Sequence, residues 1–135
     1  MNYWLVKTDP ETYAWEDFKK EGKTSWDGIR NYAARNHLKG MKKGDKVLVY
    51  HSGGKSEIRG LALVTKEFYQ DPTTDVNAWV SVGLLANNEF NKSVSLQQIK
   101  KNNKLKNMLL LKISRLSVMP VTEDEFNTII EMSEN

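Results

Sequence analysis

Three apolar segments in the middle of the chain restrict the fold most, because the turns between them are too short for anything but antiparallel pairing. Residues 46–51, 57–69 and 78–86 are rich in the branched and aromatic residues that favour β-strands. The first two are separated by Ser52-Gly53-Gly54-Lys55-Ser56, whose paired glycines accept the positive φ angles of a hairpin turn. Strands joined by short turns pair antiparallel, whereas a parallel pair needs a long crossover. The sequence therefore predicts an antiparallel sheet at the centre of the molecule.

The remaining elements surround this sheet. Further strands are expected at residues 3–8, 108–113 and 116–119, and residues 23–30 have no periodicity and are expected to form a loop. Four short helices are expected to begin at Trp15, after Asn31, after Ser95 and after Thr122. Five to six strands interleaved with about four helices predict an α+β fold, in which a small mixed or antiparallel sheet curls toward a barrel. With no repeat and no linker, residues 1–135 are expected to form one domain.

The composition excludes several kinds of chemistry. The chain has no Cys, which rules out disulfides, cysteine–zinc sites, thiolate catalysis and iron–sulfur clusters. Two His are too few for a histidine-rich metal site. The sequence has no phosphate-binding glycine loop, no Gly-x-Ser-x-Gly elbow and no pair of carboxylates at catalytic spacing. We therefore expect a binding module that is not an enzyme and that uses no cofactor and no metal.

The hydrophobic segments are short. The apolar run at the N-terminus has four residues and is followed by Lys7, unlike a signal peptide. No window approaches the roughly 20 apolar residues of a membrane span. We expect a soluble protein without a membrane partner, located in the cytoplasm, or in the nucleus if the source is a eukaryote.

The net charge of +3 conceals two basic blocks. Residues 19–46 contain nine Lys and Arg against three acids, and residues 92–115 contain seven Lys and Arg and no acid. The two blocks can form one positive face that binds a phosphate backbone. They can equally be two separate solvated surfaces, and charge alone does not decide between these interpretations.

Trp26 stands in a polar segment with basic residues on both sides. A tryptophan in a loop can offer its flat face to a nucleobase, and such stacking contributes about 1–3 kcal/mol. Arg30 and Lys23 can then hold phosphates. The alternative is that Trp26 packs in the core, as we expect for Trp4, Trp15 and Trp79, which lie on strand or helix faces.

Four segments resemble the EVE domain family, a group of PUA-like domains related to thymocyte nuclear protein and to YTH domains. They follow the family order along almost the whole chain: Tyr3-Trp4-Leu5-Val6-Lys7-Thr8-Asp9-Pro10, Ser25-Trp26-Asp27-Gly28-Ile29-Arg30-Asn31-Tyr32-Ala33-Ala34-Arg35-Asn36, Val49-Tyr50-His51-Ser52 and Ser114-Arg115-Leu116-Ser117-Val118-Met119-Pro120-Val121. The resemblance implies a PUA-like barrel and a domain that reads a modified base, such as a methylated one, in DNA or RNA.

The resemblance also implies roles for individual residues. Trp26 corresponds to the residue that stacks on the extruded base, and Lys7 and Arg115 are expected, with Arg30, to bind phosphates. The polar residues of the same pocket are then expected to be Thr8, Asp9, Asn31, Tyr32, His51 and Ser52. We expect this pocket to be concave and positively charged, with the face of Trp26 open to solvent.

Three of these residues have an alternative, purely structural role, and the proposed function has two alternatives. Asn31 can be only a helix cap, His51 only a satisfied hydrogen-bonding residue, and Arg115 only a partner of the acidic last helix. The same cavity can belong to a small-molecule sensor or enzyme, or to a module that recognises RNA by shape. The sequence does not specify the modification, the polymer or the oligomeric state.

Overall fold

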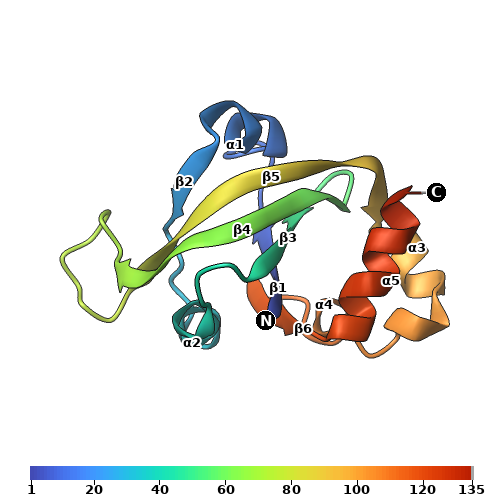
Figure 1. Cartoon of the computed structure of the whole chain (residues 1–135). Helices are drawn as coiled ribbons and strands as arrows, with labels where there is room; N and C mark the ends of the chain where they lie inside the picture. Colours follow the sequence, from blue (N-terminus) through green and yellow to red (C-terminus); the bar gives the residue numbers. More distant parts are fainter. Residues whose placement is uncertain (135) are drawn as a thin grey trace.

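The two longest strands form an antiparallel pair that spans the molecule (Figure 1). In the computed structural model, which describes residues 1–134, β4 (Glu57–Gln70) and β5 (Val80–Ser95) run side by side, and β3 (Lys46–His51) pairs antiparallel with β4. The central antiparallel unit that the short turns predict is therefore confirmed. β5 begins two residues later than expected and runs nine residues beyond Ala86.

Three further strands complete a six-stranded sheet in the order β2-β5-β4-β3-β1-β6. β1 (Tyr3–Thr8) lies parallel to β3, and β6 (Val118–Val121) lies antiparallel to β1. β2 (Lys23–Trp26) pairs antiparallel with β5 at the other edge. The long connection between parallel β1 and β3 carries α1 (Trp15–Glu21), β2 and α2 (Tyr32–Gly40), as a crossover between parallel strands requires.

The helices largely follow their sequence signals. The helix α3 (Leu96–Lys101) begins with the expected capping box, in which Ser95 and Gln98 bond reciprocally. α5 (Glu123–Glu134) begins with the same arrangement between Thr122 and Glu125. Between them lies a short 3-10 turn, η1 (Asn103–Leu105). No helix within residues 1–134 is long and apolar enough to cross a membrane.

Two segments differ from the sequence prediction. Lys23–Trp26 was expected in a loop and forms the edge strand β2, whose four residues are too few and too polar to show an alternation. The apolar run 108–113 was expected to be a strand, but it contains the one-turn helix α4 (Leu109–Lys112). A short apolar run fits either structure, and its leucines, which are not branched at Cβ, favour a helix.

The sheet curls but does not close. β2 and β6 remain at opposite edges of the described sheet, so a closed barrel is not observed. A cavity is nevertheless lined both by β2 and by the end of β1, which pairs with the opposite edge strand. The curl therefore brings the β2 edge to face the end of β1 across an open space.

The core contains one very close backbone approach. Trp15, which opens α1, is 1% exposed and lies over Gly60 of β4. A Cβ atom at position 60 would lie 2.5 Å from two atoms of the indole ring. This contact fixes α1 on the sheet, and only glycine leaves room for it.

We expect Gly60→Ala to lower the free energy of unfolding by about 1–3 kcal/mol, because the added methyl group overpacks the core. Urea unfolding measures this change. The same substitution in a Trp15→Phe background should cost less, because the smaller ring vacates the clash site. An equal cost in both backgrounds would show that the contact with Trp15 does not cause the loss.

Candidate functional site

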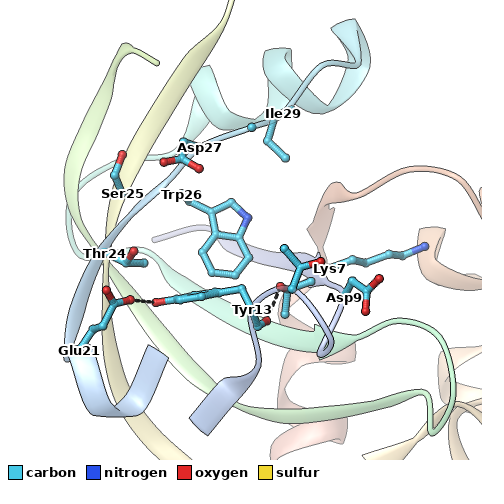
Figure 2. A pocket seen from close by; sticks show the side chains of 12 residues that line it. Lys7, Asp9, Tyr13, Glu21, Thr24, Ser25, Trp26, Asp27 and Ile29 are labelled. Atoms are coloured by element: carbon cyan, nitrogen blue, oxygen red, sulfur yellow. Dashed lines mark hydrogen bonds between the residues drawn. The ribbon is translucent and has the colours of Figure 1, made fainter. Parts of the chain in front are cut away.

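A cavity of ≈ 590 Å³ opens between the end of β1 and the β2 edge of the sheet (Figure 2). Its 12 lining residues all fall between Lys7 and Ile29, so one contiguous stretch of chain builds it. The volume is in the range of small-molecule sites. The lining includes four of the residues expected from the sequence: Lys7, Thr8, Asp9 and Trp26.

The indole of Trp26 projects into this cavity (Figure 2). Its ring packs at a tilt on Phe18, 5.9 Å between centroids, and meets Tyr13 edge-on at 6.1 Å. These contacts leave Trp26 only 6% exposed. The expectation of a ring on an open loop is therefore wrong, because Trp26 is the last residue of β2. Its two interpretations, a core residue and a wall of the binding pocket, both apply. The ring is held by the core and also forms part of the cavity wall.

Tyr13 contributes a second aromatic wall with a fixed hydroxyl. Its hydroxyl donates a short hydrogen bond to a carboxylate oxygen of Glu21. Burial and this bond raise the pKa of Tyr13 to about 12, which strengthens the preference for the neutral phenol that donates to Glu21. Sequence reasoning missed both residues, because Tyr13 precedes α1 and does not share the helical spacing of Trp15 and Phe18.

The end of β1 supplies the opposite wall. The hydroxyl of Thr8 donates to the backbone oxygen of Tyr13 at 2.6 Å, which leaves its lone pairs free to accept. The ammonium group of Lys7 donates to the backbone oxygen of Ser114 at 2.8 Å, and partial burial lowers its pKa. Asp9 uses one carboxylate oxygen to accept from the amide of Glu11 at 2.9 Å.

The cavity is lined by more carboxylates than cations. Asp9, Glu21 and Asp27 line it against the single cation Lys7, so the expected positive cavity is not found. Partial burial and the neighbouring charge of Asp71 raise the pKa of Asp27. The wall therefore suits a ligand that presents N–H donors.

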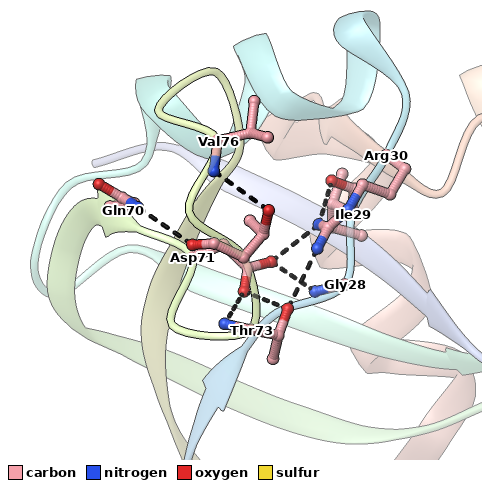
Figure 3. A network of polar contacts seen from close by, with 8 residues as sticks. Gly28, Ile29, Arg30, Gln70, Asp71, Thr73 and Val76 are labelled. Carbon is pink, nitrogen blue, oxygen red and sulfur yellow. Dashed lines mark hydrogen bonds and ion pairs between the residues drawn. The ribbon is translucent and has the colours of Figure 1, made fainter.

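A buried carboxylate holds the segment that follows Trp26 (Figure 3). Asp71 is 0% exposed and accepts from the amide of Gly28 at 2.8 Å, from Arg30 at 2.9 Å and from the amide of Thr73 at 2.7 Å. Burial alone would raise the pKa of Asp71, but the hydrogen bonds from Thr73 and Arg30 hold it well below its usual range. Arg30, expected to bind phosphate, therefore has its charge neutralised by Asp71, although its side chain is 41% exposed.

Two other expected pocket residues lie on or beside α2, away from the cavity lining. Asn31 caps the helix, with its side-chain oxygen accepting from the amide of Ala34 at 3.0 Å. Tyr32 is 61% exposed, and its ring packs at a tilt on that of Trp79. Trp79 was expected in the core and is only partly buried, because it lies in the loop before β5 and not within that strand.

His51 and Ser52 lie behind the cavity at the end of β3. The Nε2 atom of His51 accepts from the amide of Trp15 at 2.8 Å, and burial lowers the pKa of this histidine. The amide of Ser52 donates to the backbone oxygen of Thr8 at 2.9 Å. Both residues line a separate hollow of ≈ 580 Å³, which Asp9 also borders.

Arg115 lies in an exposed turn just before β6. The backbone oxygen of the adjacent Ser114 accepts a hydrogen bond from the ammonium group of Lys7, so the turn borders the β1 side of the cavity. Within residues 1–134, Arg115 forms no ion pair, and the alternative pairing with α5 is not observed. Its charge is therefore available at this edge of the sheet.

We expect Asp71→Asn to lower the free energy of unfolding by about 3 kcal/mol at pH 7, because Arg30 and the amide of Gly28 lose a buried ionised acceptor. The pKa of Asp71 is lowered in the folded state, so its stabilising contribution is complete above the unfolded pKa of about 3.9 and declines as pH falls below it. The difference between wild type and variant should therefore shrink below about pH 4. Asp75→Asn, an exposed acid in the same loop, is the matched control in urea unfolding.

Comparison with known proteins finds a family model that matches nearly the whole chain. The model of the EVE domain matches residues 2–132. Human thymocyte nuclear protein 1 is 32% identical over 167 residues, which cover 98% of this chain and 74% of the relative. A crystal structure of a protein from Agrobacterium tumefaciens has a TM-score of 0.95 at 39% identity, over 98% of this chain and 93% of that chain.

Two similar structures contain nucleic acid. The human THYN1 protein in complex with 5-methylcytosine-containing DNA has a TM-score of 0.92 at 30% identity, over 100% of this chain and 99% of that chain. A YTH domain from Zygosaccharomyces rouxii, in complex with N6-methyladenosine RNA, has a TM-score of 0.64 at 12% identity and shares the fold alone. On the family match and these similarities, the chain belongs to the EVE domain family.

Proposed function

We propose that this chain is a non-catalytic module that binds a modified nucleobase, extruded from its strand, in the cavity beside Trp26. The observation that carries the proposal is the indole wall of an open cavity in an EVE domain, together with the complex of human THYN1 with 5-methylcytosine-containing DNA. Methylated DNA is therefore the first ligand to test.

Stacking supplies part of the binding free energy. A base beside Trp26 gains about 1–3 kcal/mol, which offsets the few kcal/mol needed to unstack it from a duplex. A single strand avoids most of that cost. The domain should therefore bind single-stranded ligands more tightly than matched duplexes.

Polar groups must supply most of the discrimination. A buried methyl group contributes only about 0.8 kcal/mol, which is roughly a fourfold preference. The carboxylates of Asp9 and Asp27 are acceptors for an exocyclic amino group such as that of cytosine. A base that leaves these acceptors unpaired is rejected more strongly than one that only lacks a methyl group.

The phosphate contacts belong at the edge formed by β1 and β6. Lys7 lines the cavity and touches Ser114, and Arg115 follows directly in the exposed turn. Arg115 can hold a phosphate through two N–H groups, and Lys7 acts as a point charge. Arg30 is less suited to this role, because Asp71 already neutralises it.

A panel of matched single strands that carry cytosine, 5-methylcytosine, adenine or N6-methyladenine, titrated at one salt concentration, tests the proposal. Preference for one modified member supports it, and equal affinity for all members contradicts it. Chemical turnover of a ligand would instead indicate an enzyme. Binding that ignores both Trp26 and the modification would indicate recognition of RNA by shape.

We expect Trp26→Ala to weaken binding of the preferred strand by about 5- to 150-fold, because the stacking surface is lost. Fluorescence anisotropy measures the Kd. Trp26→Phe keeps an aromatic wall and should retain most of the affinity. Because Trp26 also packs on Phe18, circular dichroism must show that both variants are folded.

We expect Lys7→Ala to weaken binding to modified and unmodified strands by the same factor, because the ammonium group contacts phosphate and not the base. The slope of log K against log salt should fall in magnitude by about 1. Lys43→Ala, an exposed lysine near the opposite end of β3, is the matched control and should change neither quantity. A change in the preference for the modified base would place Lys7 in base recognition instead.

A further inference from the structure

Two aromatic rings pack against each other at a tilt on the surface near the cavity. Tyr32, the first residue of α2, is 61% exposed, and its ring lies 4.9 Å from that of Trp79, with an angle of 35° between the planes. Trp79 precedes β5 and is partly buried. We call Arg30, Tyr32, Arg35 and Trp79 the Tyr32–Trp79 platform.

Two arginines extend over these rings. The guanidinium carbon of Arg35 lies 4.9 Å from the centre of the Tyr32 ring, and that of Arg30 lies 5.7 Å from the centre of the Trp79 ring. Among the described residues, Arg35 donates only to neutral acceptors, the backbone oxygen of Ala78 at 3.2 Å and the side-chain oxygen of Asn36 at 2.8 Å. Within residues 1–134 no carboxylate neutralises Arg35, so the platform carries a free positive charge.

This combination of groups matches one class of ligand. Exposed aromatic rings interleaved with cations are the surface on which single-stranded nucleic acids stack their bases and place their phosphates. Core packing does not account for Tyr32, because most of its side chain faces solvent. The free charge of Arg35 complements a phosphate next to the stacked base.

The platform begins close to the cavity wall along the chain. Ile29 lines the cavity, and Tyr32 follows it by three residues, so their Cα atoms are at most about 11 Å apart. Successive nucleotides of a stacked strand are about 3.4 Å apart, and those of an extended strand are farther. A strand with one base in the cavity therefore reaches the platform with a near neighbour of that base.

We propose that the Tyr32–Trp79 platform stacks a base that flanks the one held in the cavity, so that the chain grips two separate bases of a single strand. This inference rests on the proposed function of the cavity. It also gives new roles to two residues whose expected roles differ from their positions in the structure. Tyr32 was expected in the base pocket, and Arg30 was expected to bind phosphate. The platform would add affinity for any flanking base without selecting the modification.

The test compares Tyr32→Ala with Tyr32→Phe, because the exposed side chain can be removed without disturbing the core. The ligands are a short single strand with a central 5-methylcytosine, its unmodified counterpart, both strands with abasic sites flanking the central base, and free 5-methyldeoxycytidine. We expect Tyr32→Ala to weaken both intact strands by about 5- to 150-fold and to leave their affinity ratio unchanged. The abasic strands and the nucleoside should bind wild type and variant equally, and Tyr32→Phe should behave like wild type.

Other outcomes separate the two proposals. If Tyr32→Ala binds the intact strands as wild type does, or loses as much affinity for the abasic strands, the platform is refuted while a preference for the modified base still supports the cavity. If Tyr32→Ala changes the preference itself, Tyr32 acts in the pocket and the platform is also refuted. If wild type shows no preference, the proposed function of the cavity fails, and the unmodified intact and abasic strands still decide the platform. Loss of a protein dimer in Tyr32→Ala without loss of strand affinity would assign this surface to a second copy of the chain.

Discussion

The buried carboxylate of Asp71 ties the segment that follows β2 to the β4–β5 loop at the point where the sheet pairing ends. It accepts from the amide of Gly28 and from Arg30 on one side and from Thr73 in its own loop. A buried charge is tolerated only where several donors surround it, so the loop and the segment behind Trp26 must adopt this geometry together. The path of the chain after Trp26 depends on that agreement, and so does the position of Trp79, whose backbone oxygen accepts from the amide of Asp71 at 3.0 Å.

The cavity exists because the sheet stops short of closure. A small closed barrel fills its interior with side chains. Here β2 has only four residues and pairs on one side, which leaves room between its inner face and the end of β1. Trp26, Tyr13 and Phe18 then contact one another and leave the centre of that space unfilled. The same aromatic cluster thus stabilises the fold and shapes the opening.

The sequence predicts the parts of the fold that local physics controls. The Gly53-Gly54 turn indicates the central hairpin, and the pairs Ser95 with Gln98 and Thr122 with Glu125 mark where two helices begin. The motif around Trp26 and the motif around Arg115 together indicate the family. These signals act within a few residues, so no tertiary information is needed to read them.

The rest could not be predicted because it depends on contacts between distant residues. Nothing near Asp71 in the sequence indicates that it bonds to Gly28 and Arg30, and this pairing removes Arg30 from the expected phosphate site. The strand β2 is defined only by its partner β5. Tyr13 and Glu21 meet across α1, which no periodicity of the cavity stretch reveals.

The parallel pairing of β1 with β3 has an evolutionary consequence. Almost the entire cavity wall lies in the crossover that this pairing requires, while the long β4–β5 hairpin carries none of it. Mutations of polar lining residues in the crossover, such as Asp9 and Asp27, can alter the chemistry of the binding surface without changing the strands or the aromatic cluster that secure the hydrophobic interior. The fold therefore separates the strands that stabilise it from the crossover that forms the binding surface. Related domains can acquire new ligands by substitutions among the lining residues of this crossover, while Asp71 holds the segment in place from outside it.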